Sequence, residues 1–200
     1  MRIILLLSYL IFFIGLIVKF FHIHFNAIIM MVGLFLMFLY YIISAIKKKV
    51  DVLQIVSGFA VVFWLTALLF TIKFFPFQIV VLTIAILLSV IAIVFAIKRK
   101  VFNQLIFLAL SALFCVYLFL MPSDEKYYLL NVKWNYEIDT DFFTWDKYSW
   151  FLYQNDKFDA AVKASNKALK IVKSTQNDEL IDFISTHNTK LLDNNWKNYQ

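Results

Sequence analysis

The sequence predicts an all-α protein in two parts, a five-helix transmembrane bundle followed by a small soluble helical domain. Apolar residues make up 62% of the chain, well above the roughly 45–50% that is usual for soluble proteins. The apolar residues gather in five runs, and each run is close to the roughly 20 residues that a helix needs to cross a bilayer core of about 30 Å. The runs are 3–21, 25–46, 52–71, 75–97 and 101–121.

The charges divide the chain at the same point and predict its orientation. Residues 1–121 carry nine Lys or Arg and one acid, Asp51, whereas residues 122–200 carry ten Lys and twelve acids. Six of the nine cations lie in two loops, 47–49 and 98–100, which follow the second and fourth runs. Cytoplasmic loops are enriched in Lys and Arg, so we expect both loops and the N-terminus in the cytoplasm and the tail outside. We take the first run as a retained span, because it lacks the small-residue cleavage pattern of a signal peptide.

The composition argues against several classes of function. No Asp or Glu lies in 1–50 or 52–123, and pumps and transporters usually mark their pathways with ionisable groups or broken helices. Cys115 is the sole cysteine, which excludes an intramolecular disulfide and a thiolate metal cage. His187 is the sole His of the tail, and we interpret it as an ordinary exposed residue. We therefore expect no catalytic, cofactor-binding or metal site, no enzyme activity and no nucleic-acid partner.

The first hairpin holds a candidate titrating cluster, formed by Lys19, His22 and His24. A functional interpretation is an ion- or proton-responsive site, because His changes charge near neutral pH. The alternative is that Lys19 extends to the headgroups while the histidines cap the turn at the interface. The sequence leaves both open and favours the second.

The same hairpin resembles the first transmembrane hairpin of the motor subunit L of gliding motility and type 9 secretion. The resemblance rests on Gly15, Lys19, His22, Ala27, Met30 and Gly33. In that family a membrane carboxylate follows the second-span glycine, whereas here Gly33 is followed by Leu34, Phe35, Leu36 and Met37. The resemblance implies a shared hairpin and a bacterial envelope context, without the proton-motive role.

The sequence pattern of the tail, 141–200, predicts three helices. They follow an aromatic linker, 122–140, for which extended and interfacial conformations are both open. Apolar residues recur at helical spacing on both sides of a turn at 154–156. A third helix is expected from Asp178 to about residue 195, with Asn177 or Asp178 as its N-cap. The predicted domains are thus 1–121, 122–140 and 141–200.

The first two of these helices resemble one tetratricopeptide repeat, and the third resembles the capping helix that ends such arrays; the alternative is an unrelated three-helix tail. Matching positions are Trp145, Tyr148, Ser149 and Leu152 in the first helix and Phe158, Ala161, Ala168 and Leu169 in the second. The chain departs from the family where Asn155 and Asp156 replace the turn glycine, and where Ser165 and Lys173 replace an aromatic residue and the closing proline. The resemblance implies a protein-interaction surface formed by Trp145, Tyr148, Leu152, Phe158, Ala161 and Leu169.

A single helix pair cannot bury its apolar face, because about three repeats are needed for a stable array. We therefore expect the tail to pack on its own membrane domain, on a second copy, or on another membrane or periplasmic protein. The sequence favours a non-enzymatic accessory or scaffold subunit of an envelope complex, located in the bacterial inner membrane with lipid around its spans. The alternative function is a small ion- or proton-responsive membrane module that uses Lys19, His22 and His24.

Overall fold

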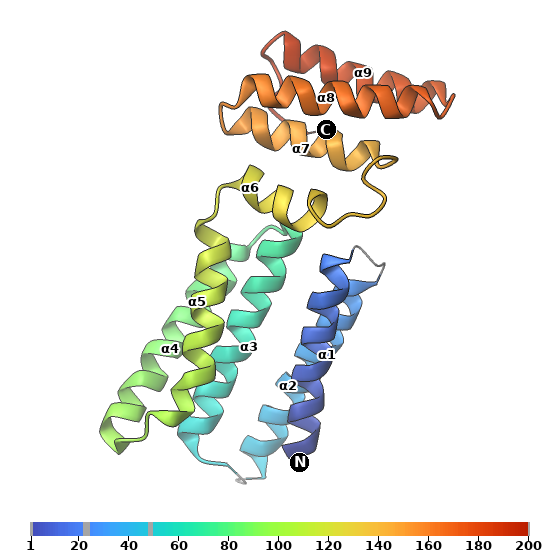
Figure 1. Ribbon diagram of the computed structural model, residues 1–200. Helices are drawn as coiled ribbons and strands as arrows, with labels where there is room; N and C mark the ends of the chain where they lie inside the picture. Colours follow the sequence, from blue (N-terminus) through green and yellow to red (C-terminus); the bar gives the residue numbers. More distant parts are fainter. Residues whose placement is uncertain (1, 22–24, 48–49, 200) are drawn as a thin grey trace. The chain divides into compact units, whose positions relative to one another are not determined.

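The chain is all-α, as the sequence predicts (Figure 1). The computed structural model describes residues 2–21, 25–47 and 50–199, and within these ranges no strand occurs. The helices are α1 Arg2–Phe20, α2 Asn26–Ile46, α3 Val52–Lys73, α4 Gln78–Arg99, α5 Ile106–Leu120, α6 Ser123–Tyr127, α7 Phe142–Gln154, α8 Phe158–Lys173 and α9 Asp178–Leu192.

The helices form two compact units. The first contains α1 to α5 and is called the membrane unit; the second contains α6 to α9 with the segment that follows α9, and is called the helical unit. Each is described by itself.

The membrane unit makes this a multi-pass membrane protein. Within the described residues, four helices, α1 to α4, are long and apolar enough to span a membrane, and the number rises to five if α5 and the helical segment 123–132 count as one broken span. The fifth run is a shorter α-helix than the sequence predicts, because residues Asn103–Leu105 form a 3₁₀ turn and α5 begins only at Ile106. With 15 residues, α5 is about 22 Å long.

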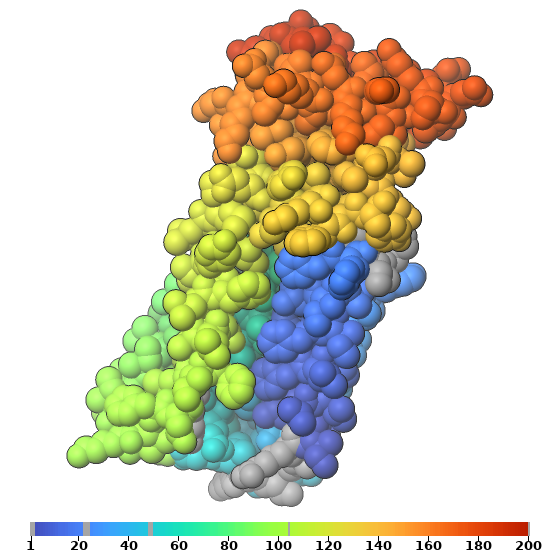
Figure 2. Space-filling view, in the orientation of Figure 1, coloured from blue at the N-terminus to red at the C-terminus, as the bar shows by residue number. Residues whose placement is uncertain are grey.

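Helix α3 is the central helix of the membrane unit. It packs against α2, α4 and α5, and 67% of its apolar window is buried, compared with 17% for α4. Helix α1 packs closely on α2, since a Cβ atom at Gly33 would lie 2.7 Å from the backbone nitrogen of Phe12. Side chains also fill the space between the ribbons of α1 and α5 (Figure 2), where the rings of Tyr9 and Phe107 stack.

The turns after α2 and α4 lie at the same end of the membrane unit. The guanidinium of Arg99, at the end of α4, donates to the carboxylate of Asp51, which directly precedes α3. The end of α4 and the start of α3 are therefore close together, as the alternation of spans requires. Lys48 and Lys49 lie outside the described residues.

The helical unit is built on the antiparallel pair α7 and α8. Asp156 in the turn between them has a positive φ of 58°, the left-handed conformation that glycine adopts most readily. Helix α9 packs on α8, and its N-cap Asn177 accepts a hydrogen bond from the amide of Leu180 at 3.2 Å. The helix ends at Leu192, earlier than the sequence predicts, and the segment after it returns to the core with Trp196 fully buried.

The aromatic linker is helical over much of its length and belongs to the helical unit. Helix α6 continues into a single π-helical turn, Tyr128–Val132, and both pack on α7. The rings of Tyr127 and Phe151 lie 4.9 Å apart, and those of Tyr128 and Tyr148 lie 5.5 Å apart. One face of α7 is thus covered by the segment that the sequence leaves as extended or interfacial.

Candidate protein-interaction surface

Two of the six residues expected at the interaction surface lie in the core of the helical unit. Leu152 and Ala161 are buried together with Leu191 and Trp196, so they hold α7, α8 and the C-terminal segment together. Leu169 is partly buried against a second cluster formed by Ala168, Val172 and Ile184. These three residues explain why the helices pack, and Leu152 and Ala161 offer no area to another molecule.

Trp145 and Tyr148 are half-buried on α7. Trp145 packs against both apolar clusters, its indole N–H donates to the carbonyl of Ile138 at 2.8 Å, and the ammonium of Lys167 lies 4.1 Å from its ring centroid. The ring of Tyr148 stacks at 6.4 Å on that of Tyr127. Both side chains therefore serve chiefly to join α7 to its neighbours.

Phe158 is the one residue of the six that stands at the surface, with 40% of its area exposed. It lines a hollow of about 330 Å³ together with Tyr153, Asp156 and Asn194. The hydroxyl of Tyr153 donates to the side-chain oxygen of Asn194 at 2.9 Å, which ties the end of α7 to the segment after α9. The hollow thus combines an exposed aromatic ring with amide, hydroxyl and carboxylate oxygens.

A buried polar cluster lies on the α7 and α9 side of the unit. The Asp146 carboxylate is fully buried, and one of its oxygens lies 2.7 Å from Nδ1 of His187 and 3.0 Å from the hydroxyl of Tyr199, which donates to it. The His187 ring is 5.0 Å from the ring of Trp196. Burial, and then the neighbouring carboxylate, raise the pKa of the Tyr199 hydroxyl well above its usual value. Nothing in the sequence patterns above predicts this cluster, which ties α9 and the C-terminal segment to α7.

The expectation that His187 is exposed is wrong. His187 is three residues after Ile184 and four before Leu191, and all three are buried. Such spacing places them on one face of a helix, so the apolar pattern of α9 already indicates that His187 lies on the buried face. Histidine counts as polar in such a pattern, and it is buried here because Asp146 supplies a partner.

The candidate titrating cluster is only partly described. Lys19 lies in the last turn of α1 with its side chain buried, whereas His22 and His24 lie outside the described residues. Among the residues that are described, no group of three His, Cys, Asp or Glu side chains is arranged to hold a metal ion. The role of Lys19, His22 and His24 stays a prediction.

Comparison with protein-family models, with curated proteins and with solved structures finds no match.

Proposed function

We propose that this protein is a non-enzymatic scaffold subunit of a bacterial envelope complex, which presents its helical unit outside the inner membrane to bind another protein. The observation that carries the proposal is the hollow at Phe158. It is a surface feature of the helical unit that combines an exposed aromatic ring with polar groups, as the anchoring sites of protein interfaces do.

The closed core of the helical unit supports this proposal. The sequence suggests that an isolated helix pair needs a partner to cover its apolar face, but here α6 and its π-helical turn cover α7 on one side, while α8 and α9 complete the stack. The space-filling view shows α7 to α9, in orange and red, as a continuous packed surface (Figure 2). A unit that closes its own core can offer its surface to a partner without unfolding.

The hollow also suggests the chemistry of the partner. Asp156 is the one charged residue among the four that line it, and the tail as a whole has two more acids than lysines. A segment that places an apolar side chain on Phe158 beside a Lys or Arg near Asp156 would match both features.

The test compares two phenylalanines of nearly equal exposure. Phe158 is 40% and Phe183 39% exposed, and Phe183 contacts the rings of Phe143 and His187 instead of the hollow. After mild-detergent purification from native membranes, we expect a stoichiometric partner with the unaltered chain and with Phe183→Ala, and its loss with Phe158→Ala. A partner that stays bound to Phe158→Ala, or the absence of any partner, would contradict the proposal.

Orientation is tested separately. A reporter that is active only in the cytoplasm should be silent when fused after Gln200 and active when inserted in the turn after α4. The reverse result would place the helical unit in the cytoplasm and remove the envelope context from the proposal.

A further inference from the structure

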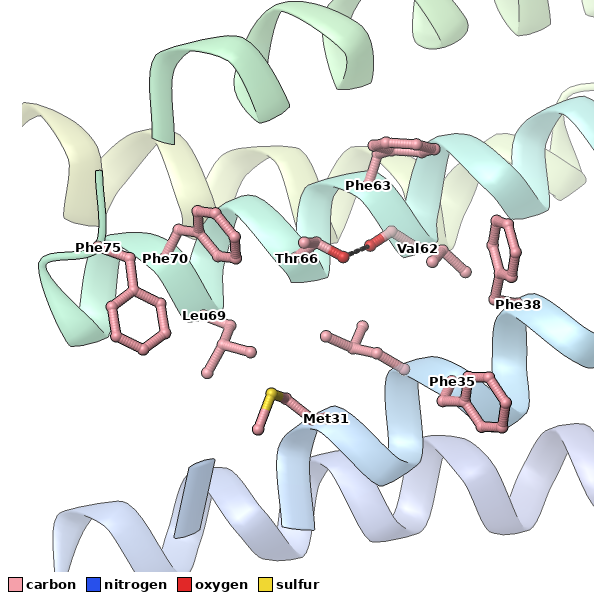
Figure 3. A pocket seen from close by; sticks show the side chains of 10 residues that line it. Met31, Phe35, Phe38, Val62, Phe63, Thr66, Leu69, Phe70 and Phe75 are labelled. Carbon is pink, nitrogen blue, oxygen red and sulfur yellow. Dashed lines mark hydrogen bonds between the residues drawn. The ribbon is translucent and has the colours of Figure 1, made fainter. Parts of the chain in front are cut away.

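A long apolar groove runs along the membrane unit between α2 and α3 (Figure 3). Its volume is about 360 Å³. Its floor is formed by buried side chains such as Val62 and Leu69, and its rim by exposed ones such as Met31, Phe35 and Phe75. The lining residues are Met31, Leu34, Phe35, Phe38, Val62, Phe63, Thr66, Leu69, Phe70 and Phe75.

The side chains that line the groove are almost all apolar. Thr66 is the one polar residue among the ten, and its hydroxyl donates to the backbone carbonyl of Val62 at 2.8 Å. The occupant must therefore be apolar. In a multi-pass membrane protein, the hydrocarbon chains of lipids are the apolar groups that surround such a groove.

The length of the groove matches one leaflet of a bilayer. From Val62 to the end of α3 at Lys73 it follows the helix for about 17 Å, compared with roughly 15 Å for half of the hydrocarbon core. The ring of Phe38 packs on that of Phe59 at 5.6 Å at the inner end, and Phe75 packs on Phe70 at 5.5 Å where α3 ends. The groove thus begins at the membrane surface and stops near the midplane, as a single acyl chain does.

A transmembrane helix is a poorer fit. A helix with its side chains is about 10 Å wide, so a stretch as long as the groove has roughly four times its volume. The body of such a helix would rest on rim residues such as Met31 and Phe35, so only its side chains could reach the floor.

The end of the groove at the membrane surface is positively charged. Lys73, half-buried in the last turn of α3, follows Leu69 and Phe70 by four and three residues and so lies on their side of the helix. The sequence has no acid between Asp51 and Asp124, so the spans themselves supply no carboxylate at this end. A phosphate beside Lys73 would be favoured by this charge.

We propose that the groove between α2 and α3 binds the acyl chain of an anionic phospholipid whose phosphate lies beside Lys73. The site does not depend on the proposed scaffold role, because it needs only the membrane unit. It would fix one lipid between the second and third spans.

The test uses the full chain, delipidated in detergent and titrated with phosphatidylglycerol while native mass spectrometry counts the bound lipids. We expect one tightly bound lipid for the unaltered chain. Met31→Trp fills the groove from its exposed rim and should weaken binding at least tenfold, whereas Ile86→Trp, on the exposed face of α4, should bind as the unaltered chain does. Equal binding by Met31→Trp and Ile86→Trp would overturn the proposal.

The headgroup is tested by Lys73→Gln, which leaves the groove itself intact. Binding of phosphatidylglycerol should fall about fivefold, as expected for one lysine near a phosphate, while binding of phosphatidylcholine should stay the same. Equal affinity of the unaltered chain for both lipids would overturn the assignment of Lys73.

A cross-linking experiment distinguishes a lipid from a second copy of the chain. In a Cys115→Ala background, oxidation in native membranes should not link Phe35→Cys chains more than Leu87→Cys chains, since Leu87 is an exposed residue of α4. Selective dimerisation through Phe35→Cys would show that a second copy covers the groove and would overturn the lipid proposal.

Discussion

The membrane unit and the helical unit differ in how polar side chains join their segments, although in both units Ser and Thr hydroxyls donate to carbonyls of their own helix. In the membrane unit, hydroxyl groups mostly donate to carbonyls of their own helix, as Thr71 does to Ala67 at 2.8 Å and Ser111 to Phe107 at 2.8 Å. In the helical unit, polar side chains bond between segments, as His187 does with Asp146 at 2.7 Å and Asn188 with Ser165 at 2.9 Å. The membrane unit has interhelical bonds too, such as that from Trp64 to Ser89 at 2.9 Å.

The difference matches the polarity of the residues that each unit exposes. Lipid cannot satisfy a polar group, so a helix that closes its own hydrogen bonds can contact lipid on any face. Helices in a membrane are then held together by close packing, to which small residues contribute. Many exposed positions of the helical unit are polar or charged, and a polar group buried in its core needs a partner from another segment. The stability of the membrane unit should therefore depend on close packing of its helices, and that of the helical unit on its buried polar pairs.

The largest expected effect is that of Asp146→Ala in the helical unit. The change leaves His187 and the Tyr199 hydroxyl without their shared acceptor inside the core. Removing one member of a buried polar pair costs about 3 kcal/mol of unfolding free energy. Denaturant unfolding of the full chain in detergent, followed by tryptophan fluorescence, would measure it, because Trp196 is buried beside His187.

Asp182→Ala is the control for this prediction. Asp182 is an exposed residue of α9, so we expect a change within about 0.5 kcal/mol. Similar losses for Asp146→Ala and Asp182→Ala would show that the buried cluster contributes nothing specific.

Gly33→Ala in the membrane unit ranks next. The new Cβ atom would lie 2.7 Å from the backbone nitrogen of Phe12 and 2.9 Å from the carbonyl oxygen of Ser8, so α1 and α2 would have to separate. Overpacking of this kind costs about 2 kcal/mol, which should appear as a lower unfolding midpoint in detergent by circular dichroism.

Gly58→Ala is the comparison that separates backbone from side-chain crowding. Its Cβ atom would clash with the ring of Tyr41, with no backbone atom of another helix among the nearest three. A ring can move where a backbone cannot, so we expect a smaller loss than for Gly33→Ala. A larger loss at Gly58 would mean that Tyr41 is held as firmly as the helices themselves.

The sequence predicts the elements of this fold better than their pairing. The apolar runs and the turn at 154–156 give the all-α class, and Asn177 is the N-cap of α9. Periodicity also places His187 on the buried face of α9, but it does not say which helix that face meets. Its partner, Asp146, is 41 residues earlier in the chain, and such a long-range contact depends on how the helices stack.

The candidate interaction surface could likewise be predicted from the sequence only in part. The repeat resemblance selects Leu152 and Ala161 because they match a consensus, and the structure shows both as core residues. Phe158 follows the same consensus and is exposed. Its hollow also needs Asn194, which lies beyond α9, where no helical pattern predicts a position.

A smaller effect is expected for Tyr199→Phe in the helical unit. At neutral pH the variant loses one hydrogen bond to Asp146, worth about 1 kcal/mol. Because burial raises the pKa of Tyr199, its hydroxyl stabilises the fold fully below about pH 10, the usual tyrosine pKa, and this contribution is lost as the pH rises further. The free energy of unfolding, measured from pH 7 to 11, should therefore fall less steeply with pH in Tyr199→Phe than in the unaltered chain.

Some loss of unfolding free energy at alkaline pH should remain in that variant. The ammonium of Lys157 donates to the Asp124 carboxylate at 2.6 Å, which raises the pKa of Lys157, and this contribution has the same sign because it too is lost on deprotonation. The exposed Tyr136→Phe is the control at neutral pH, where it should leave stability unchanged. If the unfolding free energy falls as steeply with pH in Tyr199→Phe as in the unaltered chain, titration of Tyr199 is not the cause of that fall.

The smallest effect is expected for Asp51→Asn, the counterpart of Asp146→Ala in the membrane unit. The Arg99 guanidinium bonded to Asp51 holds the pKa of this carboxyl below its usual value, so the ion pair stabilises the fold above about pH 4 and weakens as the pH falls toward the lowered pKa. Both side chains are about two-fifths exposed, and ion pairs so open to water add little. We therefore expect no measurable shift of the unfolding midpoint at pH 7. The orientation should also stay the same, because topology follows Lys and Arg and acids contribute little. A clear loss of stability would mean that the turns after α2 and α4 depend on this pair, and that the membrane unit relies on polar pairing as the helical unit does.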